Sequence, residues 1–287
     1  MSEQTKNLGE KFDMPNGESL FYVDKDHSYW RCKEDGGRGK RLTGVTTISK
    51  VFDVQVDRLL TWAARTQCIG IAEAFKNGVS TGWLDSAESI WKHLEDEHLT
   101  FEDVRLKAAK RGTNVHELAF EALGLGEPIP RLDQMTEEEQ GHAQGVMGFW
   151  LDHSPTPEQV EQVVYSSELG VAGQLDFRGK LRRCENEACG CLKVGVEQDD
   201  PGIVDCKTGR WIGGSDHLQV GGGYPLLSEE CGFGPCAWAL ILHTREDGTY
   251  ELLPAHATPA DFRNAVEVYR TVGAINRKAK ADREALE

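Results

Sequence analysis

The sequence predicts a mixed α/β (α+β) fold with a central mixed sheet flanked by helices, and the order of its segments leads to this expectation. Apolar side chains at helical spacing dominate the first half, over residues 56–76, 86–97, 100–123 and 136–153. β-rich segments dominate the second half, at residues 160–167, 171–181, 192–197, 203–208, 236–244 and 249–253. A helix over residues 215–228 interrupts these strands, and a helix over 258–281 follows them.

The N-terminal residues have the pattern of an extension that precedes the core. Residues 18–31 have the pattern of a short hairpin, residues 35–40 form a basic, glycine-rich loop, and a β-branched run at 45–48 precedes helical material. We therefore expect residues 1–99 to form a hairpin and helical extension packed on a core of residues 100–287. A cysteine-rich hairpin insertion is expected in the core at 183–192.

Composition limits the classes of function. The chain has 287 residues and a formal net charge of −15, so charge alone is not expected to drive nonspecific binding to nucleic acid. A local basic groove or a bound metal can still reverse the field at a site. No apolar run approaches the roughly 20 residues that span a membrane, and the polar N-terminus lacks a signal-peptide core. We expect a cytoplasmic protein without a membrane partner.

The segment 202–209 combines the pattern of a buried strand with an aspartate and a lysine. Side chains alternate along a strand, so Asp205 and Lys207 share one face and Cys206 lies on the other. A carboxylate and an amine on one face suit metal-dependent phosphodiester cleavage. A surface ion pair at a strand end is the simpler interpretation of this pair taken alone.

Three further features accompany this strand. His116 lies on the apolar stripe of the helix predicted over 100–123, Asp176 closes a G-x-x-D segment, and Gln219 and Tyr224 lie on the helix that follows. Each has a plain structural alternative, as a core histidine, a turn carboxylate or packing side chains. In this order, however, they resemble the RecB-type branch of the PD-(D/E)XK nuclease superfamily. The N-terminal segments 27–29, 42–47 and 60–63 resemble the start of phage-encoded members, exonucleases of the CRISPR-associated nuclease type.

The resemblance implies a restriction-endonuclease-like core and a role for each matching residue. His116 would be a metal ligand and Asp176 the central metal-binding aspartate, while Asp205 and Lys207 would form the D-x-K pair. The backbone carbonyl of Cys206 would be a further ligand. The metal would be Mg²⁺ or Mn²⁺, which prefer oxygen ligands. The cation would polarise the scissile phosphate, and Lys207 would position water and offset negative charge.

Two positions fit the family pattern less closely. Glu168 matches a glutamate often found near the site, but a glutamate before a glycine turn is also typical of a surface. Gln219 matches the glutamine of a Q-x-x-x-Y helix, yet position 223 is Gly and the tyrosine follows at Tyr224. A spacing of five rotates the two side chains apart on an α-helix, unless the three glycines at 221–223 distort it. Close approach of a DNA backbone would be one use for those glycines.

The cysteines suggest a second metal. Cys184, Cys189 and Cys191 lie between the two acidic strands, and Cys32 could complete a tetrahedral zinc site. Cys231 and Cys236 are alternative fourth ligands. An iron–sulfur cluster and a metal-free thiol loop are the alternatives to zinc, and the imidazoles of residues such as His153 show no metal-ligand spacing.

These features predict a metal-dependent deoxyribonuclease, with exonuclease action on DNA ends in phage-type recombination, replication or repair. The resemblance also implies a catalytic role for Gln219 and contacts of Gln219 and Tyr224 with DNA. Arg178 and Arg210 are candidate phosphate contacts, and Trp211 could stack on a base. DNA is the expected partner, alongside a recombination or single-strand-binding protein or a second copy of the chain, in the host cytoplasm if phage-encoded. The alternatives are a structure-specific endonuclease, a non-catalytic DNA-binding or scaffold protein, and a zinc-stabilised interaction module.

Overall fold

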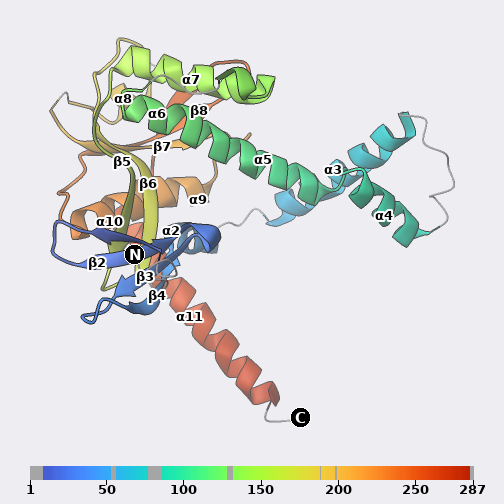
Figure 1. The fold of residues 1–287 in the computed structure, drawn as a ribbon, viewed down its shortest axis with the longest axis horizontal. Helices are drawn as coiled ribbons and strands as arrows, with labels where there is room; N and C mark the ends of the chain where they lie inside the picture. Colours follow the sequence, from blue (N-terminus) through green and yellow to red (C-terminus); the bar gives the residue numbers. More distant parts are fainter. Residues whose placement is uncertain are drawn as a thin grey trace. The chain divides into compact units, whose positions relative to one another are not determined.

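A computed structural model describes residues 9–52, 56–76, 86–127, 132–187, 189–197 and 199–284 (Figure 1). It contains one mixed sheet, whose strands are β1 (Glu10–Asp13), β2 (Ser19–Val23), β3 (Ser28–Cys32), β4 (Arg38–Gly44), β5 (Thr156–Ser166), β6 (Val171–Lys180), β7 (Gly202–Lys207), β8 (Trp238–Thr244) and β9 (Tyr250–Pro254). β4 runs parallel to β6 and β7 parallel to β8, and the other neighbours are antiparallel. The predicted mixed α/β class, with helices flanking a central mixed sheet, is thus confirmed.

The helices fall before, within and after the strands of the second half. The α-helices are α2 (Val45–Ser49), α3 (Val56–Lys76), α4 (Ala87–Asp96), α5 (Phe101–Val115), α6 (Ala122–Gly124), α7 (Glu137–His153), α8 (Gly190–Lys193), α9 (Gly214–His217), α10 (Tyr224–Glu230) and α11 (Pro259–Glu284). The 3₁₀ segments are η1 (Asp24–Asp26), η2 (Lys50–Phe52) and η5 (Leu132–Gln134). Two π-helical segments, η4 (His116–Glu121) and η6 (Leu218–Gly223), interrupt the α-helical path.

The chain divides into two compact units, one of residues 1–52 with 115–287 and one of residues 53–114. This grouping differs from the expected boundary at residue 99, because strands β1 to β4 belong to the main sheet and only the helices after them form a separate unit. Within the smaller unit, Gly70 lets α3 approach the backbone before α5, since a Cβ there would lie 2.4 Å from the Leu99 carbonyl oxygen. Thr100 and Asp103 cap the start of α5.

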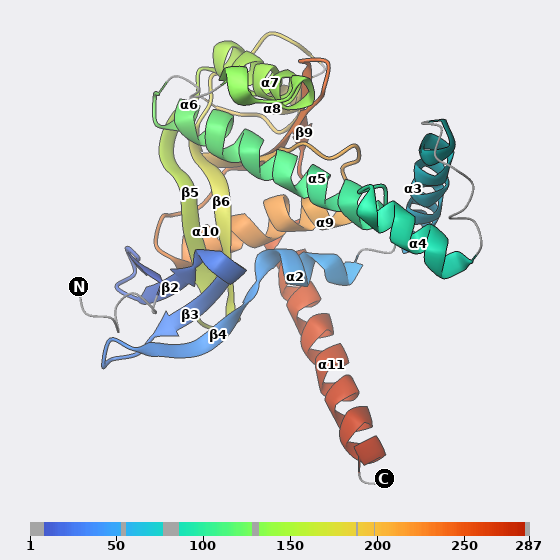
Figure 2. The same cartoon turned by 45° about the vertical axis from the view of Figure 1, so that its right-hand side comes forward.

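Each face of the main sheet has its own apolar core. One core joins Ile203 and Ile241 to Tyr224, Leu227 and Phe262 of the C-terminal helices. The other core joins the strand residues of the opposite face to α7, and its members include Val204, Leu240, Val146, Phe149 and Phe177. Figure 1 shows β7 and β8 between α7 on one side and α9 and α10 on the other, and Figure 2 shows α11 starting beside α2.

Strand β6 organises the centre of the sheet. β5 pairs with it along its whole length, from Thr156 opposite Lys180 to Ser166 opposite Val171. A strand has two hydrogen-bonding edges, so β4 and β7 must share the other one. β4 pairs only with residues 171–172 and β7 only with residues 177–179, which leaves residues 173–176 unpaired on that edge. This gap in the ladder positions the candidate site.

The glycine run 221–223 lies in η6, where it allows close contact between parts of the protein itself. A Cβ at Gly221 would lie 2.4 Å from the Ala257 carbonyl oxygen, and one at Gly222 would lie 2.7 Å from the Thr258 carbonyl oxygen. The chain's own backbone, and not that of DNA, therefore approaches these glycines closely. A distortion of this helix, which the sequence left open, is present as a π-helical turn.

Two local expectations from the sequence are wrong. Residues 192–197 do not form a strand, because α8 covers Gly190–Lys193 and Gly195 adopts a left-handed φ of 66° that a strand excludes. The β-branched run 45–48 forms most of the helix α2. The helix starts after Gly44, whose backbone is extended, and it buries Val45 and Ile48. Packing against the sheet thus overrides the weak helix propensity of β-branched residues. Among the described helices, none combines the length and the apolar character that crossing a bilayer requires.

The close backbone contact at η6 predicts that a methyl group added at Gly221 destabilises the protein, whereas one added at Gly214 does not. Gly221→Ala should lower the free energy of unfolding by about 1–3 kcal/mol, because the Ala257 backbone must move to admit the methyl group. Gly214→Ala is the control, since no atom lies within 4 Å of the position that its Cβ would take. There we expect a change of at most about 1 kcal/mol in the stabilising direction. Urea unfolding of both variants measures the difference, and equal stabilities would contradict this packing.

Candidate active site

Asp176 bridges the gap between β6 and β7. The backbone ladder of these strands ends at Phe177 opposite Val204, and the Asp176 Oδ2 atom then accepts the Cys206 N–H at 2.7 Å. The side chain thus takes the place of a backbone acceptor. Gly173, three residues earlier, makes room beside this gap, because a Cβ there would lie 2.8 Å from Val45 Cγ2 and 3.1 Å from Tyr224 Cε1. The G-x-x-D spacing therefore combines a packing glycine with a bridging carboxylate.

His116 faces the same gap from the first residue of η4. Its Nε2 atom lies 2.9 Å from the Cys206 carbonyl oxygen, and its Nδ1 atom lies 3.3 Å from Asp176 Oδ2 and 3.7 Å from Glu161 Oε1. Burial disfavours the charged ring, but the carboxylates of Asp176 and Glu161 outweigh burial and raise the pKa of His116 to about 9. Acceptors at both ring nitrogens are what an imidazolium requires.

Glu161 is a site residue that the sequence reasoning did not identify. It lies on β5 with a φ of 49°, between the ladder pairs formed by Val160 and Gln162, and its Oε1 atom is buried without a hydrogen-bond partner among the described residues. The hairpin register offered a signal: counting five residues from the Ser166–Val171 pair along each strand reaches Glu161 on one and Asp176 on the other.

Glu168, the glutamate suggested by resemblance, lies away from this group. It is exposed in the turn between β5 and β6, beyond the Ser166–Val171 pair that ends the hairpin, whereas Asp176 lies in the middle of β6. The glutamate on the strand opposite Asp176, rather than the one nearer to it in sequence, contributes to the site.

A second group continues from the first along β7. Lys207 Nζ lies 2.6 Å from Asp205 Oδ2 and donates to Gln219 Oε1 at 3.4 Å, and Gln219 Nε2 donates to the Tyr224 hydroxyl at 2.5 Å. Asp205 is 1% exposed, whereas the Lys207 side chain keeps 23% of its surface in solvent. The aspartate is therefore fully internal, whereas the lysine side chain is partly exposed.

The π-helical turn explains the five-residue spacing of Gln219 and Tyr224. The Tyr224 N–H donates to the Gln219 carbonyl oxygen, which is the i→i+5 bond of a π-helix. The extra residue brings Tyr224 back over Gln219, where an α-helix would rotate it away. Position 223 departs from the four-residue motif in sequence, but the two side chains still meet.

The charges of this cluster do not balance. Burial, followed by Asp176, raises the pKa of Asp205 to about 6, while burial and Glu161 raise that of Asp176 to about 6 against the opposing effect of His116. Burial lowers the pKa of Lys207, but the carboxylates of Asp205 and Asp176 outweigh it and raise that pKa. Three carboxylates thus face two cationic side chains when all are ionised. Added positive charge would stabilise the ionised cluster.

His116, Glu161 and Asp176 form a group that could hold a cation, since one ligand atom from each lies within 4.8 Å of the others. Two carboxylates and one imidazole suit Mn²⁺ or Mg²⁺, and the buried Glu161 oxygen without a hydrogen-bond partner fits a ligand role. Asp205 lies outside this group and contacts Lys207 instead. The carbonyl of Cys206, which the resemblance implies as a ligand, contacts the His116 ring.

Of the candidate DNA contacts, Gln219, Tyr224 and Arg178 are buried, whereas Arg210 and Trp211 are exposed. Arg178 is 4% exposed, forms an ion pair with Glu158 and contacts the Pro235 carbonyl oxygen, so it is a structural cation and not a surface contact for phosphate. Arg210 and Trp211 follow β7 in an exposed loop, with the guanidinium 5.3 Å from the ring centroid. Trp211 is 73% exposed.

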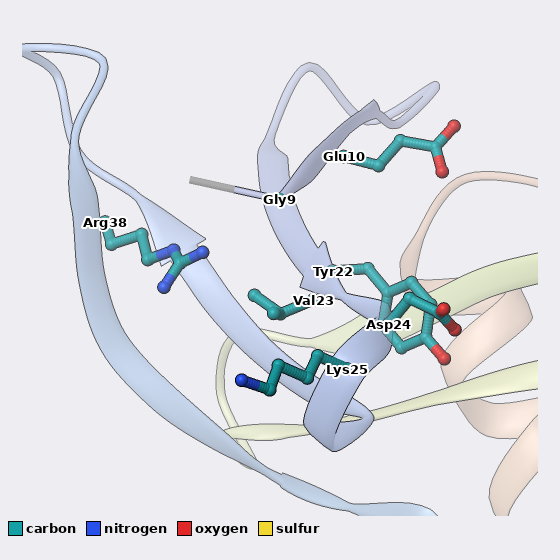
Figure 3. Close-up of a pocket in the computed structure, with 7 residues that line it drawn as sticks. All are labelled: Gly9, Glu10, Tyr22, Val23, Asp24, Lys25 and Arg38. Carbon is teal, nitrogen blue, oxygen red and sulfur yellow. The ribbon is translucent and has the colours of Figure 1, made fainter. Parts of the chain in front are cut away.

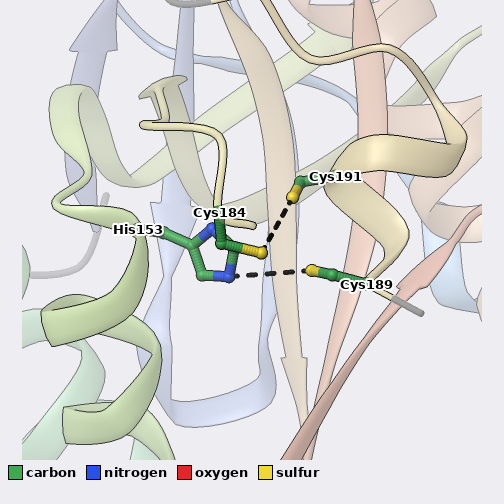
Figure 4. Close-up of side chains that lie close together, drawn as sticks. All are labelled: His153, Cys184, Cys189 and Cys191. Atoms are coloured by element: carbon green, nitrogen blue, oxygen red, sulfur yellow. Dashed lines mark hydrogen bonds between the residues drawn. The ribbon is translucent and has the colours of Figure 1, made fainter. Parts of the chain in front are cut away.

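The structure also corrects the expected ligand set of the cysteine loop. His153, not Cys32, lies beside Cys184, Cys189 and Cys191 (Figure 4). Cys32 lies on β3, where its thiol contacts the Lys33 carbonyl oxygen. The other suggested fourth ligands also lie outside this group, and Cys231 bonds to the backbone of Tyr165.

A separate hollow of about 300 Å³ lies at the edge of the sheet (Figure 3). Its lining comes from the start of the chain and β4 and contains none of the residues of the candidate site. Both charge signs line it, with Glu10 and Asp24 opposed by Lys25 and Arg38.

No family model matches the chain, and no curated protein matches it. The likeness to PD-(D/E)XK nucleases accordingly depends on the residues themselves. Of those, His116, Asp176, Asp205 and Lys207 with Gln219 and Tyr224 come together in space along one connected set of contacts.

Glu161 and Glu168 provide a matched pair for testing the ligand group. Glu161→Gln should weaken Mn²⁺ binding by at least about tenfold, because even the loss of an outer-shell partner costs roughly 10–100-fold in metal affinity. Glu168→Gln removes an equal charge from the exposed turn and should leave the affinity unchanged. Isothermal titration of Mn²⁺ into each variant measures this, and equal weakening by both changes would argue against Glu161 as a ligand.

The raised pKa values predict that protons compete with the cation. Below about pH 6 the carboxyls of Asp176 and Asp205 hold protons, and His116 keeps its proton up to a pKa of about 9. Mn²⁺ binding near neutral pH should therefore release protons, and affinity should rise as the pH increases from 6 toward 9. Titration in two buffers of different ionisation enthalpy measures the proton count. A pH-independent affinity without proton release would contradict the cluster's electrostatics.

Proposed function

We propose that this protein is a metal-dependent DNA nuclease that hydrolyses phosphodiester bonds at DNA ends. The observation that carries the proposal is the adjacency of two groups on β6 and β7. The cation-binding group of His116, Glu161 and Asp176 is joined through Cys206 to the Asp205–Lys207 pair and its Gln219–Tyr224 support. A cation site beside a protonated, partly exposed lysine suits a reaction in which negative charge increases on a phosphate.

Each side chain has a distinct part in the proposed reaction. A divalent cation held by Glu161, Asp176 and the His116 ring would supply positive charge against the scissile phosphate. Lys207, protonated and partly exposed, would donate to the attacking water or to a phosphate oxygen. Asp205 holds that amine by charge, and Gln219 limits its direction.

The neighbouring surface supports a nucleic acid as the substrate. Arg210 and Trp211 follow Lys207 by three and four residues and present a guanidinium and an aromatic face to solvent. Such a pair can contact a phosphate and stack on a base of a single-stranded end. The resemblance to phage exonucleases favours action at ends over internal cleavage. The net charge of −15 implies that binding relies on such local contacts and not on the overall field.

Cleavage of end-labelled DNA tests this function. With Mg²⁺ or Mn²⁺ the wild-type protein should degrade linear DNA and leave covalently closed circles intact, and chelation should stop it. Lys207→Met should lower the rate by roughly 10²–10³-fold without loss of Mn²⁺ affinity, because it removes charge stabilisation and not a ligand. Asp176→Asn should abolish both Mn²⁺ binding and cleavage.

Folding controls are required because both residues are partners of buried charges. Removal of one member of a buried pair can cost about 3–5 kcal/mol, so circular dichroism and urea unfolding must accompany each assay. Degradation of circles at the rate of linear DNA would replace end-dependent action with endonuclease action. Cleavage that persists in both folded variants would contradict the assignment.

A further inference from the structure

A second group of metal-ligand side chains lies at the end of α7, apart from the candidate active site. His153 is the last residue of that helix, and Cys184, Cys189 and Cys191 lie on the connection from β6 to β7. Figure 4 shows the imidazole and the three thiols directed toward one another. One ligand atom from each residue lies within 4.8 Å of the other three.

The distances fit a mononuclear site, and the thiols are not joined in a disulfide in this structure. The Cys184 and Cys191 sulfurs lie 3.5 Å apart, whereas a disulfide bond measures about 2.05 Å. Cys189 Sγ lies 3.8 Å from His153 Nε2. In a tetrahedral zinc site with Zn–S bonds of about 2.3 Å, two sulfur ligands lie about 3.8 Å apart. These two separations are close to those that a bound zinc ion would impose, and all four ligand atoms lie within 4.8 Å of one another.

The histidine is oriented as a ligand. Its Nδ1 atom lies 3.1 Å from the Arg182 carbonyl oxygen, so Nδ1 carries the proton and donates it there. The lone pair of Nε2 is then directed toward the thiols, in the arrangement typical of metal-bound histidines. The Arg182 N–H in turn donates to the His153 carbonyl oxygen at 2.7 Å. His153 is fully buried, with the ring centroid of Phe149 at 5.4 Å.

We propose that His153, Cys184, Cys189 and Cys191 bind one structural Zn²⁺ ion. All four positions of a tetrahedron come from the protein, which leaves no open position for a substrate and so indicates a structural role. Cys189 and Cys191 are buried, and Cys184 is partly exposed. Four ligand atoms around one point suit a single ion, whereas an iron–sulfur cluster spreads its ligands over several irons.

The ion would hold together a connection that has little regular structure. Between β6 and β7 the described residues form only the short helix α8, and Gly190 in it packs against the Leu252 backbone. A bound ion would join this connection to the end of α7. Cys189 and Cys191 belong to the same apolar core as Val204 and Cys206 of β7. Asp176 and Asp205 lie on the two strands that this connection links. The inference does not depend on the proposed nuclease activity.

Elemental analysis of the purified full-length chain tests the proposal. We expect one zinc and no iron per chain in the wild-type protein, and loss of zinc in Cys184→Ser and in His153→Ala. Cys32→Ser is the matched control and should retain the zinc, because its thiol lies on β3. Asp176→Asn should also retain it, which separates this ion from any zinc bound at the candidate active site.

Modification of the wild-type thiols tests the site even if the variants fail to fold. Titration with an organomercurial should release the zinc, measured with a chromogenic chelator, and should shift thermal unfolding to a lower temperature. Iron in place of zinc, no metal after reconstitution with ZnCl₂, or zinc retained in folded Cys184→Ser and His153→Ala would each overturn the proposal. So would loss of zinc in folded Cys32→Ser. Because zinc content is measured without DNA, failure here is distinct from absence of nuclease activity.

Discussion

The hydrogen bond from the Cys206 N–H to the Asp176 carboxylate is the contact on which the candidate site depends. It connects β6 to β7 where their backbone ladder has ended, so a side chain and not a peptide group completes the connection. The freed carbonyl of Cys206 faces the His116 ring, and the residues on either side of Cys206 form the buried ion pair. One interaction thus relates the histidine, the central aspartate and the Asp205–Lys207 pair to each other.

The electrostatics of this arrangement explain why a cation suits it. An ionised carboxylate taken out of water is costly unless an opposite charge accompanies it, and the raised pKa values of Asp176 and Asp205 reflect that cost. Protonated His116 and Lys207 offset two of three carboxylates. A divalent cation would replace the proton on His116. Its charge would also allow the carboxylates of Glu161, Asp176 and Asp205 to be ionised at the same time. Binding, protonation and local stability are therefore linked in this cluster.

The sequence predicted the members of the cluster better than their contacts. His116, Asp176, Asp205 and Lys207 could be selected because charged and polar groups interrupt apolar periodic segments in a particular order. The partner of Tyr224 could not be fixed, because a π-helical turn depends on how closely the three glycines pack against the backbone at 257–258. The choice between Glu161 and Glu168 depended on the register of the β5–β6 hairpin, which places Glu161 and not Glu168 beside Asp176. Likewise, His153 is 31 residues from Cys184 in sequence, and only the packing of α7 brings the two together.

The two metal-ligand groups differ in the chemistry that they suit. The group at Asp176 is rich in oxygen and partly open to solvent, as a hard cation and a phosphate substrate require, while the group at His153 is closed and rich in sulfur. The most direct test is the anomalous diffraction of a crystal soaked in Mn²⁺, measured near the manganese edge. A peak between Glu161, Asp176 and His116 that is absent from Asp176→Asn crystals is the expected result. At saturating Mn²⁺, no peak there would contradict the account of the site.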